Sequence, residues 1–206
     1  MKPLILASGS PRRAKILRDL GVEFDVVKTE AAEVSIPSDP MRTVTENALA
    51  KLHAAAARER DPPAAGGEGG PVLAADTIVW FNGKIYGKPR DLAEARAFLR
   101  ELSGQTHTVF TGVAFRAAAR EPGVCRGSAR GASTPRILVA CARSLVTFRE
   151  LSAAAISEYV ARVRPLDRAG AYDIDESGDL IVASYDGEYE NIMGLPVEPL
   201  RRFGII

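Results

Sequence analysis

Residues 71–81 read PVLAADTIVWF, a long apolar stretch that holds a single acid, Asp76. The dipeptide Asn82-Gly83 follows at once and is the strongest short signal for a tight β-hairpin. An apolar run bounded by such a turn predicts a buried strand. The stretch therefore predicts a buried strand that opens a hairpin, and the rest of the fold has to be arranged around it.

Strand-like and helix-like segments alternate along the rest of the chain. Residues that favour helix N-caps precede three expected helices, at Ser10, Asp39 and Asp91. We expect further strands at residues 4–6, 24–27, 105–115 and 136–150, and helices at residues 11–20, 40–60, 92–102 and 152–163. Helices mixed with hairpins and one buried strand predict an α/β domain with a mixed β-sheet and flanking helices, not a doubly wound parallel sheet.

In two segments the apolar residues are not regularly spaced as in a helix or a strand. Residues 61–70, DPPAAGGEGG, are typical of a flexible exposed loop. Residues 116–136 are rich in Ala, Gly and Arg and are interpreted as a long, mobile hairpin excursion. This excursion carries five arginines, beginning with Arg116, and fits either a solvated loop or a basic patch.

The overall charge limits the classes of partner. The formal net charge is +1, from 27 basic and 26 acidic residues, so no bulk field favours nucleic acids or membranes, and any anion site must be local. The two cysteines have no metal-binding spacing and are interpreted as ordinary thiols in a reducing compartment. No apolar run approaches the roughly 20 residues that span a bilayer, and the N-terminal run of five apolar or small residues is too short for a signal peptide. These features predict a cytoplasmic protein.

The first turn of the first expected helix carries charges of the unfavourable sign. Its first turn carries Arg12 and Arg13, although the positive end of a helix dipole favours acids there. With the hydroxyls of Ser8 and Ser10 and the free N–H groups of the helix start, these arginines form a plausible phosphate cradle. An exposed first turn remains the alternative.

Three further residues are candidates for chemistry. The Asp76 carboxylate is costly in its apolar strand unless it is paired, hydrogen-bonded or bound to a metal. Lys88 follows the hairpin in YGKPRD, and Lys51 lies beside apolar helix positions; solvation and snorkelling, respectively, are their alternative explanations. The sequence GKIYGKP falls short of a P-loop, and His107 is interpreted as a structural, hydrogen-bonded histidine.

The order of the motifs matters more than any one of them. The segments LASGSPRRAKIL, AADTIV, GKPRDLAEARAFLRELSGQTHTVFTGVAF and GEYENIMGLPVEPL together resemble the Maf family of nucleoside triphosphate pyrophosphatases. The resemblance implies one domain over residues 1–206, with two lobes around a central cleft, related to inosine triphosphatases. It also implies cleavage of a nucleoside triphosphate to the monophosphate and pyrophosphate, a required Mg²⁺ or Mn²⁺, and a homodimer.

The family's functional positions transfer residue by residue. The resemblance implies phosphate binding by Ser8, Ser10, Arg12, Arg13, Lys51 and Lys88, catalytic roles for Asp76 and Lys88, and metal binding by Asp76 and Glu33. Whether Asp76 would be a metal ligand or a general base stays open. Asn191, in YENIMGLP, is expected either to be structural or to line the cleft.

One segment departs from the family pattern. Family members that act on dTTP and UTP read AYGIQG where this chain reads AYDIDE, so Asp173, Asp175 and Glu176 replace Gly, Gln and Gly. Asp175, in place of a glutamine expected near the active site, is predicted to bind substrate. It could add a metal ligand, alter base recognition or weaken activity. Arg168 stands where lysine is common, which keeps the charge but changes its geometry.

These observations lead to one main hypothesis and two competitors. The main hypothesis is a metal-dependent pyrophosphatase acting on dTTP, UTP or modified nucleotides. The first competitor is a nucleotide-binding regulator of cell division without turnover. The second is a nucleic-acid binder that uses residues 116–136, against which the near-neutral charge counts.

Overall fold

The computed structural model describes residues 3–58, 69–118 and 136–206. In these residues seven strands form one mixed sheet in the order β2-β1-β3-β5-β6-β7, and β4 pairs with β3 outside that path. The strands are β1 (Leu4–Leu6), β2 (Phe24–Val26), β3 (Val72–Phe81), β4 (Lys84–Tyr86), β5 (Thr106–Arg116), β6 (Ile137–Phe148) and β7 (Val182–Asp186). β1 is parallel to β2 and β3, and the other pairings are antiparallel. The predicted α/β fold with a mixed sheet is confirmed.

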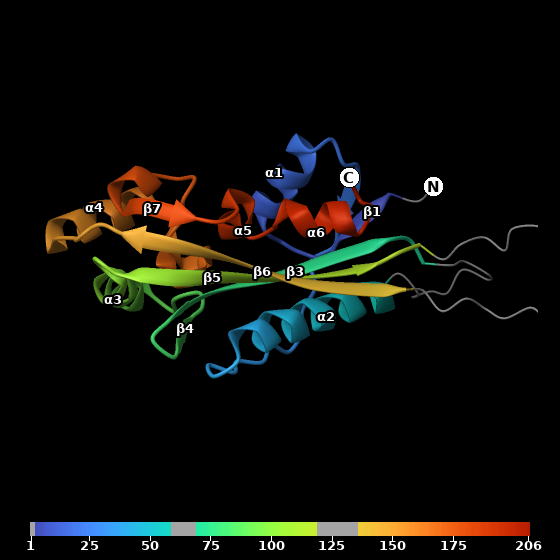
Figure 1. Ribbon diagram of the computed structural model, residues 1–206, viewed down its shortest axis with the longest axis horizontal. Helices are drawn as coiled ribbons and strands as arrows, with labels where there is room; N and C mark the ends of the chain where they lie inside the picture. Colours follow the sequence, from blue (N-terminus) through green and yellow to red (C-terminus); the bar gives the residue numbers. More distant parts are fainter. Residues whose placement is uncertain (1–2, 59–68, 119–135) are drawn as a thin grey trace, which may run out of the picture.

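Helices cover both faces of this sheet. They are α1 (Pro11–Asp19), α2 (Pro40–Arg58), α3 (Leu92–Leu102), α4 (Ala153–Arg162), α5 (Tyr189–Met193) and α6 (Val197–Arg202), with the 3₁₀ turns η1 (Pro165–Asp167), η2 (Ala169–Ala171) and η3 (Gly178–Leu180). Figure 1 shows α2 under one face and α1, α5 and α6 over the other, with α3 and α4 at the far end of the long strands. The sequence did not predict β7, α5 or α6.

Two of these local signals act as the sequence predicts, and one does not. Asp91 Oδ1 accepts the Glu94 N–H at 2.8 Å, which caps α3. Asn82 and Gly83 both have positive φ, 47° and 77°, as a tight hairpin turn between β3 and β4 requires. Ser10 occupies the N-cap of α1, but its side chain makes no capping bond.

The predicted excursion at residues 116–136 needs a correction at its first residue. Arg116 ends β5, is 5% exposed, and donates from Nη2 to the Gly70 carbonyl at 2.7 Å. It is therefore a buried strand residue and not part of a loop. Most of the two predicted loops, residues 59–68 and 119–135, lies outside the described residues.

The buried apolar side chains form two large clusters. One joins α3 and α4 to β3, β5 and β6, and the other joins α1 and α6 to β1, β3 and β5. A third, smaller cluster seats α2 on the sheet. Nearer the start of α2, a Cβ on Gly112 of β5 would lie 2.3 Å from the Val44 carbonyl oxygen, so only glycine lets α2 approach this closely.

Within the part of the chain that the structure describes, every helix is too short or too polar to cross a membrane.

Candidate active site

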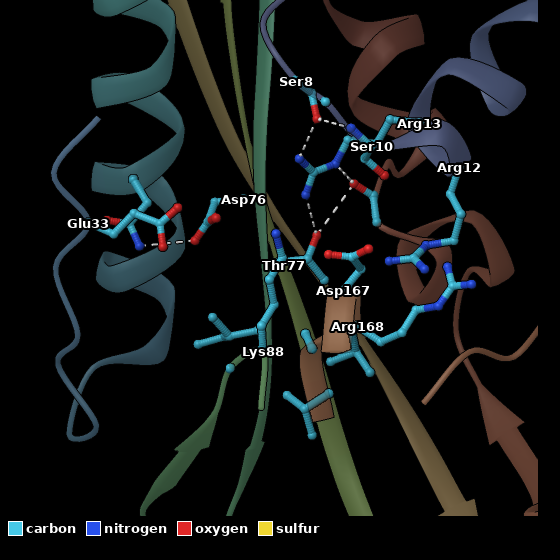
Figure 2. A pocket seen from close by; sticks show the side chains of 18 of the residues that line it. Ser8, Ser10, Arg12, Arg13, Glu33, Asp76, Thr77, Lys88, Asp167 and Arg168 are labelled. Atoms are coloured by element: carbon cyan, nitrogen blue, oxygen red, sulfur yellow. Dashed lines mark hydrogen bonds between the residues drawn. The ribbon is translucent and has the colours of Figure 1, made fainter. Parts of the chain in front are cut away.

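A cleft of about 980 Å³ opens between the sheet, α1, α2 and the segment around η1 and η2. Eight of the predicted site residues line it: Ser8, Ser10, Arg12, Arg13, Glu33, Lys51, Asp76 and Lys88. Figure 2 shows Asp76 and Glu33 on one side and Arg12 and Arg168 on the other, with Thr77 and Lys88 between them. The structure thus brings together predicted residues that are separated by up to 80 positions in the chain.

The cleft carries a local excess of positive charge. Its described lining has seven cationic and four acidic side chains, although the whole chain has a formal charge of only +1. They are the cations Arg12, Arg13, Lys28, Lys51, Lys88, Arg164 and Arg168 and the acids Glu33, Asp76, Asp167 and Asp173. A polyanion is the ligand that such a lining attracts.

One side of the cleft holds Glu33, Lys51 and Asp76, which we call the carboxylate cluster. Lys51 of α2 donates from Nζ to Asp76 Oδ1 at 2.5 Å and contacts Glu33 Oε1 at 2.8 Å. Asp76 is 7% exposed in the middle of β3, so its predicted need for a partner is met by this ammonium. Lys51 is therefore not snorkelling along the helix, because its charge lies between two carboxylates.

Asn47, which the sequence pattern did not single out, completes this side. Its Nδ2 donates to Asp76 Oδ2 at 3.0 Å and to the Val34 carbonyl at 3.1 Å, while its Oδ1 accepts the Val34 N–H at 2.8 Å. The amide thereby fixes the backbone next to Glu33 and holds Asp76 at once. Its position one turn before Lys51 on the same helix face was the available signal.

Arg13 is used mainly to hold the fold together. Its guanidinium donates to the carbonyls of Gly194 (2.8 Å) and Ala75 (2.9 Å) and to the hydroxyls of Ser8 and Thr77 (both 3.0 Å). Burial lowers the pKa of Arg13 from its usual value, and the charges of Asp76 and Glu33 oppose that shift. This first-turn arginine, which breaks the dipole rule, thus points into the protein and fixes two hydroxyls of the cleft.

Arg12 takes part in a second group of charges, the arginine cluster of Arg12, Asp173 and Arg168. Asp173 Oδ2 accepts from Arg12 Nη1 at 3.0 Å and from Arg168 Nη1 at 2.7 Å. The Asp173 side chain is only 4% exposed, and Arg168 also pairs with Glu176 at 2.8 Å. The sequence marked Asp173, Glu176 and Arg168 only as departures from a pattern, because Arg12, the partner of Asp173, lies 161 residues away.

Lys88 lies at the exposed end of the β3–β4 hairpin and lines the cleft. Among the described residues it makes no ion pair or side-chain hydrogen bond, so its ammonium is available to a ligand. Thr77 of β3 also lines the cleft, and its Oγ1 is 3.0 Å from Thr111 Oγ1.

Two predicted positions lie elsewhere. Asp175 does not line the cleft; its side chain is 43% exposed and contacts Lys15 at 3.9 Å and the Tyr189 hydroxyl at 3.3 Å. Asn191 is fully buried behind the cleft, where its Nδ2 donates to the Val109 carbonyl and to Ser144 Oγ, so the structural interpretation of this residue holds. Of the substituted acids, Asp173 is the one that reaches the cleft.

His107 supports the cleft from behind. It is 1% exposed, and its Nε2 lies 3.0 Å from the hydroxyl of Tyr172, a cleft residue. Burial lowers the pKa of His107 to about 4, so the imidazole is neutral at neutral pH. The predicted structural, hydrogen-bonded histidine is confirmed.

The fold and this site define an α/β protein with a cleft suited to a phosphate-bearing ligand. The model of the Maf family, described as Maf-like protein, matches residues 3–203, so the chain belongs to the Maf family.

Curated relatives cover nearly the whole chain. A dTTP/UTP pyrophosphatase of Bacillus cytotoxicus is 39% identical over 203 residues, which is 98% of this chain and 94% of the relative. One from Bacillus cereus is 38% identical over 98% of this chain and 88% of the relative. One from Thermosipho melanesiensis is 35% identical over 94% of this chain and 92% of the relative.

Proposed function

We propose that this protein hydrolyses nucleoside triphosphates, dTTP and UTP in particular, to the nucleoside monophosphate and pyrophosphate. The observation that carries the proposal is the opposition of the carboxylate cluster and the arginine cluster across one cleft; between them lies Lys88, which pairs with none of the described residues. A triphosphate has several negative charges to bind, and its cleavage depends largely on positioning and electrostatic stabilisation. The names of the relatives supply the nucleotides dTTP and UTP.

The residues present fit a divalent cation. Asp76 and Glu33 already share one cation, the Lys51 ammonium, and Mg²⁺ is commonly bound by one or two carboxylates together with substrate phosphates. No group of three or more His, Cys, Asp or Glu side chains that could hold a metal occurs among the described residues, so phosphate oxygens and water would have to complete the coordination. A Mg²⁺ or Mn²⁺ held by Asp76 and Glu33 would neutralise charge on the phosphates.

The side chains then have distinct roles in the proposal. Lys88 and Arg12 bind phosphate oxygens with donors that the described residues leave unused. Water attacks the α-phosphorus, the bond to the bridging oxygen breaks and that oxygen leaves with pyrophosphate. The Asp76 carboxylate is suited either to hold the cation or to accept the proton that the water loses. Asn47 keeps that carboxylate in place in both cases.

A nucleotide panel tests the proposal. Purified protein is incubated with dTTP, UTP, the other common triphosphates and modified nucleotides, with Mg²⁺ or Mn²⁺, and pyrophosphate release is measured. We expect release from dTTP and UTP, and its loss in Asp76→Asn and Lys88→Ala. Asp179→Asn and Lys84→Ala are matched controls, because both side chains are exposed and lie outside the cleft.

The outcomes separate the hypotheses. If no triphosphate is cleaved with either ion, the enzyme proposal fails, and tight calorimetric binding without turnover would favour a nucleotide-binding regulator. Salt-dependent binding to DNA or RNA that is lost on deleting residues 119–135 would favour the nucleic-acid binder. The homodimer and the cytoplasmic location stay predictions, which light scattering and cell fractionation would test.

A further inference from the structure

Asp173 places a negative charge inside a site proposed to bind negative charge. Its Oδ2 accepts from both arginines of the cluster, and its Oδ1 accepts the Asp175 N–H at 2.9 Å. Its backbone is held in turn by the buried Tyr159 of α4, whose hydroxyl accepts the Asp173 N–H at 2.8 Å and donates to the Asp173 carbonyl at 3.2 Å. The carboxylate is therefore a fixed point on which both arginines converge.

We propose that Asp173 is a positioning residue that acts through Arg12 and Arg168 as a built-in counter-anion and sets how tightly the cleft binds pyrophosphate groups. The inference rests on the pyrophosphatase function proposed above. In the free protein the carboxylate holds the two guanidiniums together. When a phosphate group binds to them, the same carboxylate repels it, which favours release of the pyrophosphate product.

The arginines keep donors for a ligand while Asp173 holds them. A guanidinium has five N–H donors, and among the described residues Arg12 uses only the one that goes to Asp173. Arg12 is also the more accessible of the two, with 22% of its side chain exposed, whereas Arg168 Nε is buried and has no hydrogen-bond partner in the described part of the chain. A phosphate can therefore join the cluster without first displacing the carboxylate.

Charge determines the direction of the effect. A phosphate bound to these arginines would lie on the order of 6 Å from the carboxylate, about two hydrogen-bond lengths away. At an effective dielectric constant near 20, that repulsion weakens binding by up to about a hundredfold before salt screens it. Removing the carboxylate loosens Arg12, whereas Arg168 keeps its ion pair with Glu176 at 2.8 Å. Ordering the one freed side chain again costs only about a few-fold to tenfold in affinity. The repulsion outweighs this loosening, so the protein without the Asp173 charge should bind pyrophosphate more tightly.

The test compares Asp173→Asn with the wild-type protein. Asparagine keeps the shape and removes the charge. Calorimetry with inorganic pyrophosphate, in EDTA so that no divalent ion takes part, should give a Kd about tenfold lower for the variant. With dTTP and Mg²⁺, KM should fall by a similar factor while kcat does not rise, because pyrophosphate leaves more slowly. Asp179→Asn is the matched control, an exposed aspartate six positions on that lies outside the cleft, and its Kd should equal that of the wild type.

A second variant shows whether the change in Kd comes from the lost charge or from misfolding. Asp173→Gly restores the glycine of the AYGIQG pattern, removes the same charge and should shift the pyrophosphate Kd in the same direction; thermal melts establish that each variant is folded. An unchanged or higher Kd in the folded variants, or no pyrophosphate binding by any of the proteins, overturns the inference. Because pyrophosphate binding is measured without turnover, this result is independent of whether the protein cleaves any triphosphate.

Discussion

The carboxylate cluster and the arginine cluster lie on opposite sides of the cleft and are reversed in charge. In the first, a lysine bridges two acids, Glu33 and Asp76; in the second, the acid Asp173 bridges two arginines. The first carries one net negative charge and the second one net positive charge, so one side attracts a cation and the other an anion. A nucleotide that brings both a metal ion and phosphates matches this arrangement, and the comparison can be tested one cluster at a time.

Removing the central cation of the carboxylate cluster should have the largest effect. Lys51→Gln leaves Asp76 and Glu33 without their shared ammonium and deprives the phosphates of a cation. We expect pyrophosphate release to fall roughly a thousandfold, equivalent to about 4 kcal/mol. The fall is measured as kcat/KM with dTTP and Mg²⁺.

Lys15 provides a close control for Lys51. It also contacts two acids, Asp19 at 3.3 Å and Asp175 at 3.9 Å, but it is 52% exposed and lies outside the cleft. Lys15→Gln should change kcat/KM by less than about threefold, because exposed ion pairs contribute little. Equal losses in both variants would mean that general surface charge, and not the cluster, controls activity.

The second prediction concerns how the free energy of unfolding depends on pH. The group responsible is His107, which hydrogen-bonds Tyr172 on the arginine side of the cleft. The pKa of His107 is lowered to about 4 in the folded protein by burial, against about 6.5 when unfolded, so the unfolded state takes up the proton first as the pH falls. Stability should therefore be highest above pH 6.5 and decrease from there to pH 4, by about 3 kcal/mol from this group.

Urea unfolding at pH 7 and pH 4 checks this prediction when the wild type is compared with His107→Gln. The variant should lose about 3 kcal/mol less than the wild type over that interval, although its stability at pH 7 is lower. Equal losses in the two proteins would show that His107 protonates in the folded state.

The sequence predicted the carboxylate side better than the arginine side, and the difference has a physical reason. Asp76 was found because an acid in an apolar strand is costly wherever the strand goes, and the Asp91 cap and the Asn82-Gly83 turn depend only on near neighbours. The link between Arg12 and Asp173 depends on how α1 and the segment after η2 meet, which no local pattern encodes. The inward direction of Arg13 was unpredictable for the same reason, since its acceptors include the Gly194 carbonyl, 181 residues away.

The third prediction disturbs the carboxylate side through its packing. In Gly112→Ala the new Cβ would lie 2.3 Å from the Val44 carbonyl oxygen, so α2, which carries Asn47 and Lys51, has to move off the sheet. We expect a loss of about 2 kcal/mol in the free energy of unfolding, measured by denaturant titration, together with reduced activity.

Gly178, which lies beside Asp173, is the corresponding glycine on the arginine side. Its added Cβ would have no neighbour closer than 3.6 Å, so Gly178→Ala should change stability by less than about 0.5 kcal/mol. A similar loss in both alanine variants would contradict the view that the close approach of α2 makes Gly112 necessary.

The smallest effect is expected from a substitution at Asp175. This substitution tests whether the site on the arginine side extends beyond Asp173. Asp175→Gln introduces the residue of the AYGIQG pattern, but the side chain lies outside the cleft, 43% exposed beside Lys15 and Tyr189. Since an exposed charge at the surface is well screened, we expect KM for dTTP to change by less than about threefold. The Asp173→Asn change, two residues earlier, should shift it about tenfold. If Asp175→Gln instead alters KM or the base preference more than tenfold, the segment after η2 has to move toward the cleft when substrate binds, and the boundary of the site between Asp173 and Asp175 applies only to the free protein.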